Sequence, residues 1–322
     1  MEAAVSSRLE LRPGSEVEIF TVLSGSRAIW GAGVSMEDYI EYHRLIRHHG
    51  WSAQNFQHLV LVDDLNTILS SCKQYKHRVR LDGQTLRVAS VGAVFTPPEY
   101  RSRGYANQML EHIMDELRGQ GFDLIMLYSD IGTEFYARLN FRTVIKYDPA
   151  YTFINNKFPP SEISVYEYLP EQLLDWHLSY SQKQRFSLAR TPLYFQLLSE
   201  RISWHRKYMG FRDQRVIVSD QEQSYLWVDL NKWRPIIRDF ASASENPPEA
   251  LARLLAALQA RFGFKEIGGW LPAEFDGYHF LKISEKHLRA KTIPMVSPLS
   301  EQGSLVLQLP DDEIHFWLAD YF

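Results

Sequence analysis

An arginine- and glycine-rich turn, RSRGYA at residues 101–106, holds the side chains best suited to bind an anion. Arg101 and Arg103 offer charge-assisted hydrogen bonds, and Gly104 lets a bound group come close to the backbone. If a helix starts at this turn, its unpaired N–H groups point outward and its dipole favours negative charge. These residue types predict a pyrophosphate site, although the same turn in isolation is also compatible with an ordinary solvent-exposed connection.

The residues on either side of the turn supply the elements that it needs. Residues 85–95 are rich in valine and alanine and predict a strand, which Pro97 and Pro98 end because proline cannot donate to a sheet ladder. After the turn, apolar residues recur at helical spacing until Gly119 and Gly121. We therefore expect a strand, a tight turn and an amphipathic helix.

A second patterned segment follows at a short distance. Residues 124–128 form an apolar run typical of a buried strand, and Phe135 and Tyr136 lie in the helical pattern after it. Two such elements in series are much rarer than either one alone.

Together the segments TPPEYRSRGYA and LYSDIGTEFYARLNF resemble the acetyl-CoA signature of the GNAT superfamily of N-acetyltransferases. The resemblance implies an α/β fold with a mixed sheet that splits open at the thioester, acetyl-CoA as co-substrate, and Tyr136 as general acid. Two positions depart from the pattern, since Ser129 stands where Asn is frequent and Asn140 where Gly is frequent. The implied cofactor-binding residues are Phe95, Thr96, Arg101, Ser102, Arg103, Gly104, Tyr105, Ala106 and Ser129.

The implied mechanism is direct attack of a primary amine on the thioester in a ternary complex, with a backbone N–H near Phe95 polarising the oxyanion. No activated Cys or Ser indicates a covalent intermediate. An amine pocket could be lined by Trp30, Trp51 and Trp176 through cation–π contacts, but such tryptophans are more often core residues.

Composition excludes several classes of protein. The 322-residue chain is 45% hydrophobic and 23% charged, with a net charge of −4, so nothing recommends a nucleic-acid or membrane partner. The chain has one cysteine, no apolar run near the ~18 residues of a membrane span, and no signal-peptide core in residues 1–14. These features lead us to expect a cytoplasmic protein. The histidines at positions 43, 48 and 49 do not share a helical face at ligand spacing, so we expect no metal site.

In the first half we expect a strand at residues 17–23, a helix at 35–49, strands at 57–62 and 67–81, and a hairpin turn at Asp82-Gly83. A loop-like segment before residue 161 suggests a boundary. We assign residues 1–160 to the catalytic GNAT domain.

The second half repeats the order of elements in a weaker form. A helical pattern at residues 170–187 precedes expected strands at residues 215–218, 224–230 and 236–240, a helix from Pro247 and a strand at residues 266–271. Its strand-to-helix turn has two prolines and no arginine, so residues 161–290 are expected to form a degenerate GNAT-like domain without cofactor. Residues 291–322, which end with four aromatics in seven residues, are expected to pack back on the fold.

The two-domain order resembles two GNAT branches, the fungal lysine N6-acetyltransferases and the enhanced-intracellular-survival aminoglycoside acetyltransferases. The second branch implies that the terminal carboxylate of Phe322 is the catalytic base; Asp130, Glu134, water and no dedicated base stay open. The acceptor is a small-molecule or lysine-type amine, which leaves free lysine, an aminoglycoside, a polyamine or a protein amine. A non-catalytic acetyl-CoA-binding module or scaffold is the alternative function, and the oligomeric state is open.

Overall fold

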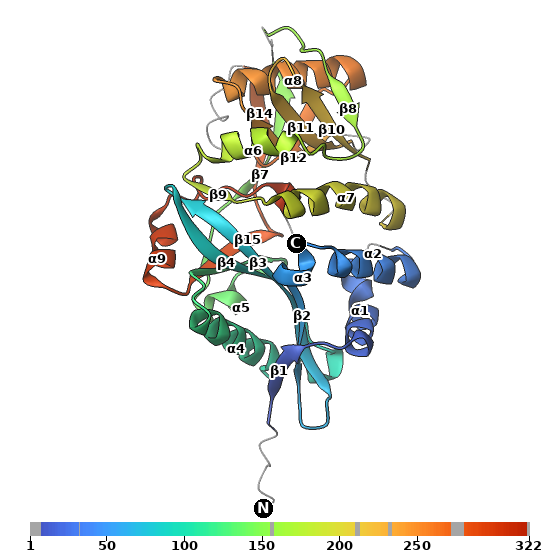
Figure 1. Ribbon diagram of the computed structural model, residues 1–322, viewed down its shortest axis with the longest axis vertical. Helices are drawn as coiled ribbons and strands as arrows, with labels where there is room; N and C mark the ends of the chain where they lie inside the picture. The colour runs from blue at the N-terminus through green and yellow to red at the C-terminus, as the bar shows by residue number, and fades with distance from the viewer. Residues whose placement is uncertain are drawn as a thin grey trace, which may run out of the picture.

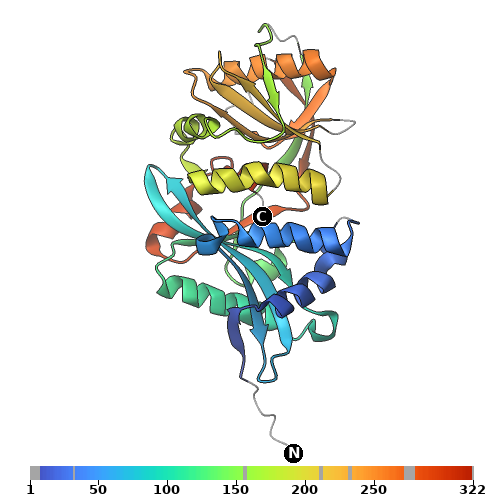
Figure 2. The same ribbon diagram turned by 45° about the vertical axis from the view of Figure 1, so that its right-hand side comes forward.

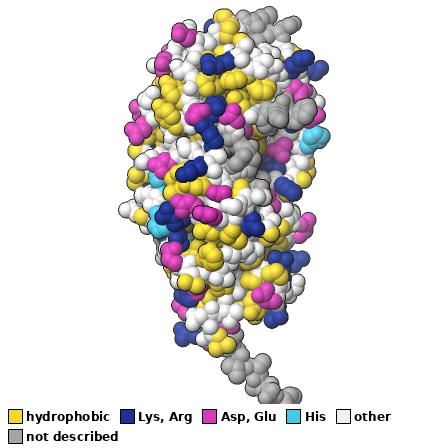
Figure 3. Space-filling view, turned by 90° about the vertical axis from the view of Figure 1, so that its right-hand side faces the viewer, with side chains coloured by type: hydrophobic (Ala, Val, Ile, Leu, Met, Phe, Trp, Pro, Cys, Tyr) yellow, Lys and Arg dark blue, Asp and Glu magenta, His cyan; other side chains and the backbone are white. Residues whose placement is uncertain are grey.

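The computed structural model describes residues 8–31, 33–154, 158–209, 213–230, 234–271 and 280–320. Two mixed β-sheets form two lobes that follow one another along the long axis of the molecule (Figure 1). This mixed α/β architecture agrees with the predicted fold class. Basic and acidic side chains are interspersed on the face shown in Figure 3, so that face presents no broad field of one sign.

The first sheet has the strand order β1-β2-β3-β4-β5-β15-β6, with β9 added beside β3. Its β3–β4 hairpin closes at Asp82 and Gly83, which both adopt positive φ angles of 46° and 82° as the predicted turn requires. The strands are β1 (Glu10–Pro13), β2 (Phe56–Val62), β3 (Ile68–Leu81), β4 (Gln84–Phe95), β5 (Leu124–Ser129), β6 (Arg142–Thr143), β9 (Phe186–Leu188) and β15 (Ile293–Pro298).

Helices cover the two faces of this sheet differently. Helix α4 (Tyr105–Gly119) buries its apolar stripe against one face, in a cluster that includes Cys72, Ala89 and Val91. The other face is covered by helices near the junction of the lobes. There α2 (Met36–His48) packs against α7 (Pro192–Tyr208), and the two run alongside each other in Figure 2.

The predicted strand at residues 17–23 is wrong, because this stretch is part of helix α1 (Glu16–Trp30). Ser15 and Glu18 form a reciprocal capping box, and Glu18 also accepts two hydrogen bonds from Arg12. Of the apolar residues that suggested a strand, Ile19, Val22 and Leu23 are buried at helical spacing, whereas Val17 and Phe20 are exposed. The predicted helix at residues 170–187 is shorter in the structure, α6 (Leu173–Ser181), because the chain then enters β9.

The second sheet has the order β14-β7-β13-β12-β11-β10-β8. Helix α8 (Pro247–Phe262) begins after the Asn246 cap, and Gly263 ends it with a φ angle of 74°. Strand β13 then pairs in parallel with β12, as β5 does with β4 in the first sheet. The strands are β7 (Tyr147–Phe153), β8 (Ser164–Tyr166), β10 (Gln214–Ser219), β11 (Ser224–Asp229), β12 (Ile236–Ser242), β13 (Glu266–Gly269) and β14 (Leu281–Leu288).

Three of the described strands cross between the lobes, and one of them is β9, which lies within residues 161–290 but pairs with β3 of the first sheet. Strand β7 precedes residue 160 but pairs with β13 and β14 of the second sheet. Strand β15 returns to the first sheet and pairs with β5 on one side and β6 on the other. Strands of the two sheets thus alternate along the chain. The domain boundaries at residues 160 and 290 remain a prediction about folding units.

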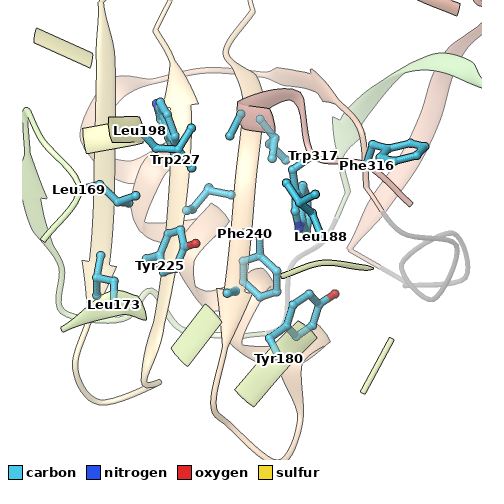
Figure 4. Close-up of a cluster of buried hydrophobic side chains, with 14 of the residues drawn as sticks. Leu169, Leu173, Tyr180, Leu188, Leu198, Tyr225, Trp227, Phe240, Phe316 and Trp317 are labelled. Carbon is cyan, nitrogen blue, oxygen red and sulfur yellow. The ribbon is translucent and has the colours of Figure 1, made fainter. Parts of the chain in front are cut away.

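A buried ionic cluster joins the end of the chain to the second sheet. The Arg190 guanidinium lies 2.5 Å from Asp239 Oδ2 and 2.7 Å from Asp320 Oδ2, and Tyr225 donates a hydrogen bond to Asp239 at 2.7 Å. Phe316 and Trp317 are buried nearby, and Figure 4 shows Trp317 beside Leu188. Since both carboxylates share one buried cation, the cluster depends on Arg190.

Replacing Arg190 with Met should destabilise the protein by about 3–5 kcal/mol, because it leaves two buried carboxylates without a cation. Urea unfolding at neutral pH measures this loss. The control is Arg185→Met, which removes an exposed arginine that pairs with Asp82 and Glu313, and its loss should be much smaller. Equal losses in the two variants would contradict a special role for the buried cluster.

Candidate active site

The parallel strands β4 and β5 are paired over only part of their length. Pairing runs from Val88 opposite Leu124 to Val91 opposite Leu127, although the strands continue to Phe95 and Ser129. Beyond this point β4 has a residue with a positive φ angle, Ala93 at 49°, and its register with β3 shifts. This irregularity is a β-bulge, and it turns the end of β4 away from β5.

The arginine- and glycine-rich turn is built as predicted. Gly104 has a φ angle of 84° and immediately precedes α4, and no side chain caps that helix N-terminus. Arg101 Nε donates to the carbonyl of Thr96 at 3.1 Å, while the Arg103 guanidinium lies over the Tyr100 ring. Both arginines are exposed and neither forms an ion pair within the described residues. Ser102, Tyr105 and Ala106 complete this surface, which can accept an anion.

Tyr136 lies on the short helix α5 (Glu134–Ala137), on the same face of the sheet as α4. Its side chain is only 6% exposed and lies in the cluster that contains Cys72. Burial, with smaller contributions from Cys72 and Asp130, raises the pKa of Tyr136 to about 12. At neutral pH the phenol is therefore protonated and can donate a hydrogen bond.

The other predicted cofactor residues have defined roles in the structure. Phe95 is buried against Val22 and Val60, and its carbonyl accepts a hydrogen bond from Ser70. Thr96 Oγ1 lies 3.2 Å from the Ser70 hydroxyl. The Ser129 hydroxyl donates to the Gly132 carbonyl, so it shapes the loop after β5.

The structure places the candidate bases and tryptophans as follows. Asp130 accepts a hydrogen bond from the Thr292 backbone at 2.8 Å, Glu134 is exposed, and Phe322 lies outside the described residues. Trp51 is buried in the core cluster, where it lies 4.8 Å from the Tyr194 ring, and Trp30 and Trp176 are partly buried against apolar clusters.

A polar group that sequence reasoning did not select lies on the face of the sheet opposite α4. His58, Lys73 and Gly92 are neighbours across β2, β3 and β4, and Tyr75 and Ser90 form the next row. Lys73 Nζ lies 3.2 Å from Nδ1 of His43 on α2. The two-residue period of β3 could have grouped Lys73 with Tyr75, but no local signal connects them with His43.

This group is desolvated and its histidines are neutral. Removal from water lowers the pKa of Lys73 to about 7, with the nearby charge of Arg201 adding to the shift. Burial lowers the pKa of His58 to about 3, and it holds the pKa of His43 well below its ordinary value. At neutral pH His43 can therefore accept a hydrogen bond from Lys73.

A cavity of about 420 Å³ lies at the junction of the two sheets, and Pro294 of β15, the partner of Tyr128 on β5, is one of its lining residues. Tyr128 follows Leu127, the last residue of β5 that pairs with β4. Its ring centroid lies 6.3 Å from that of Trp270 and 6.0 Å from that of Phe316. Arg289 stacks on Trp270 at 3.7 Å. Aromatic and charged side chains line the cavity, including Lys146, Tyr151, Trp270, Arg289, His315 and Phe316.

Comparison with known proteins agrees with this geometry. Residues 33–144 match the family described as an acetyltransferase (GNAT) domain. A GCN5-related N-acetyltransferase from Anabaena variabilis is similar in structure over 92% of this chain and 74% of its own, with 14% identity and a TM-score of 0.68. Eis1 from Mycobacterium abscessus is similar over 93% of this chain and 75% of its own, with 14% identity and a TM-score of 0.63.

A putative acetyltransferase from Pyrococcus horikoshii aligns over 100% of this chain and 98% of its own, at 13% identity and a TM-score of 0.57. No curated protein matches the sequence. Residues 33–144 thus match a GNAT acetyltransferase domain, and the two-lobed fold of the chain resembles that of these solved structures. Within the described residues no helix is long and apolar enough to cross a membrane, and no group of three potential metal ligands is found.

Cys72, the one cysteine of the chain, should not react in the native protein, because burial raises the pKa of its thiol to about 12. Ellman's reagent at pH 8 is expected to modify no thiol in the folded protein and one per chain in guanidinium chloride. Rapid modification of the native protein would show an accessible thiolate and reopen covalent catalysis.

Proposed function

We propose that this protein is an acetyl-CoA-dependent N-acetyltransferase of the cytoplasm that transfers the acetyl group to a primary amine by direct attack in a ternary complex. The proposal is carried by one observation. One part of the first sheet adjoins three features: the exposed arginine turn at the start of α4, the ends of β4 and β5 that do not pair with each other, and the protonated Tyr136.

The turn provides the fit for the coenzyme diphosphate. Two exposed arginines, first-turn amides without a side-chain cap and the open backbone of Gly104 together form an anion site. A Cβ added at Gly104 would meet nothing nearer than the flexible end of Gln108 at 3.8 Å, so the space above the turn is open. We place the pantetheine arm along Phe95 and Thr96, with Ser129 shaping the loop on the β5 side.

Tyr136 is suited to protonate the departing thiolate. An ordinary thiol has a pKa of about 8.5, well below that of Tyr136, which would make proton transfer from the phenol unfavourable. The surroundings change this balance, because the neighbouring Cys72 thiol has its pKa raised to about 12, as Tyr136 does. Removal from water would raise the pKa of a coenzyme thiol held against Tyr136 in the same direction, which favours proton transfer from the phenol.

The cavity between the sheets is our candidate acceptor pocket. Its volume of about 420 Å³ suits a small molecule, and Asp311 and Asp312 on its lining offer carboxylates to an ammonium group. It meets the first sheet at Pro294 of β15, which pairs with Tyr128 where β5 has left its pairing with β4. A pocket of this kind favours an enzyme over a module that only binds acetyl-CoA.

Gly104→Glu should abolish binding of acetyl-CoA, because it places a carboxylate at the diphosphate site and strains a residue with positive φ. The control is Gly83→Glu, which has the same strain at a φ angle of 82° but lies in the remote β3–β4 hairpin. Isothermal titration calorimetry of both variants separates the two effects. Unchanged affinity in Gly104→Glu would remove the assignment of the turn.

Tyr136→Phe should reduce turnover by about 10²- to 10⁴-fold with little change in the Kd for acetyl-CoA, since only the proton donor is lost. Release of free thiol is measured with a panel of lysine, a polyamine, an aminoglycoside and a lysine-containing peptide. Tyr100→Phe, beside the phosphate turn, is the control. A fully active Tyr136→Phe enzyme would exclude the acid role, and a wild-type protein that binds acetyl-CoA without turning over any amine would favour the non-catalytic alternative.

A further inference from the structure

We propose that Lys73 is the acceptor-side base of this transfer and that His43 positions it. The inference rests on the proposed function and assigns a group that must take the proton lost by the acceptor. An amine resembling lysine, with a pKa of about 10.4, is protonated at neutral pH and cannot attack until that proton leaves.

The position of Lys73 in the sheet is the first argument. Lys73 is paired with Gly92 on β4, one residue beyond Val91, where the pairing of β4 with β5 ends. Because side chains alternate along a strand, Lys73 and Tyr136 lie on opposite sides of the sheet at this opening. A thioester held between the unpaired strand ends would have its proton donor on one side and Lys73 on the other.

The surroundings of Lys73 are the second argument. Its Nζ hydrogen bonds with His43 at 3.2 Å, and no carboxylate lies within ion-pair distance of it in the described part of the chain. The charged and titratable groups around it are His43 on α2, His58 on β2 and Arg201 on α7. Burial, with a smaller contribution from the charge of Arg201, lowers the pKa of Lys73 to about 7, and no acidic partner in this group offsets the shift.

His43 fixes the direction of the lysine side chain. Its ring is held edge-on against Tyr39 at 4.5 Å and against Tyr42 at 5.2 Å. Since His43 is neutral, it accepts a hydrogen bond from Lys73 and leaves the lone pair of the neutral amine free for another proton. His43 therefore acts through Lys73 and is a positioning residue.

Ser90 supplies an independent sign that this face receives a ligand. Its side chain is fully buried in the row next to Lys73, and its hydroxyl has no hydrogen-bond partner among the described residues. A buried hydroxyl without a partner is costly, and a polar group of an acceptor or a water molecule would satisfy it.

The proton balance of the reaction is complete with these groups. Neutral Lys73 takes one proton from the acceptor ammonium, and the freed lone pair forms the C–N bond while the C–S bond breaks. Tyr136 gives a proton to the thiolate and regains one from solvent, and the acceptor nitrogen, which is positively charged after the attack, loses its second proton to solvent. Lys73 returns its proton to solvent, so the products are the amide, free coenzyme thiol and one proton.

Lys73→Met and Lys73→Arg test the base role, with Lys76→Met as the control on the same strand, where Lys76 lies near the Phe122 ring. In the wild type, kcat/KM should rise with pH through about 7, because Lys73 must lose its proton to act. Both Lys73 variants should lose about 10²-fold or more in kcat/KM along with this pH limb, and both should bind acetyl-CoA normally. Arginine fails to rescue because its guanidinium does not give up a proton.

His43→Leu and His43→Asn test the positioning role. His43→Leu removes the acceptor altogether, whereas His43→Asn keeps one in its Oδ1. His43→Leu should lower kcat and shift the pH limb downward, because an acceptor for the lysine ammonium is lost, and His43→Asn should restore part of both; the Kd for acetyl-CoA stays the same in each. Wild-type rates and pH profile in Lys73→Arg would show that a cation, not a base, is needed, and would overturn the inference. Failure of the proposed function appears differently, as absence of turnover in the wild-type protein itself.

Discussion

Strands β4 and β5 share backbone hydrogen bonds only as far as Val91 and Leu127, and the candidate site depends on where that pairing stops. The bulge at Ala93 directs β4 away from β5. The backbone groups at the ends of these two strands therefore do not hydrogen bond with one another. Unpaired backbone groups in a sheet seek a ligand, water or another segment. The arginine- and glycine-rich turn follows directly from the displaced strand, and Tyr136 and Lys73 lie on opposite faces of the sheet near this point.

The two faces of this sheet provide different chemical environments. The face under α4 is apolar, and its burial raises the pKa values of Tyr136 and Cys72 together. The opposite face contains Lys73 and neutral histidines below α2 and α7, and burial there favours the uncharged amine. Desolvation thus acts in opposite directions on acids and bases: it favours the protonated phenol on one face of the sheet and the uncharged amine on the other.

Local sequence signals predicted the part of the site that is contiguous in the chain. The turn at residues 101–106, helix α4 and the Asp82-Gly83 hairpin each depend on neighbouring residues, so their residue types were sufficient. Helix α1 was missed because its capping box outweighs a run of residues that also favours strands. The pairing of Lys73 with His43 joins residues 30 positions apart on different elements, and the cavity between the sheets is formed by segments that meet only in the folded protein.

The insertion of β15 between β5 and β6 has a consequence for the order in which the protein is made. The first sheet lacks an internal strand until residues 293–298 have been synthesised, so the lobe that begins the chain cannot complete its sheet before the second lobe has emerged from the ribosome. During that interval the edges of β5 and β6 are uncovered, and uncovered strand edges are sites of aberrant association. A chain that stops before residue 293 would keep Lys73 and Tyr136 but would lack the strand between β5 and β6. Production of the folded protein is therefore sensitive to any event that ends translation late.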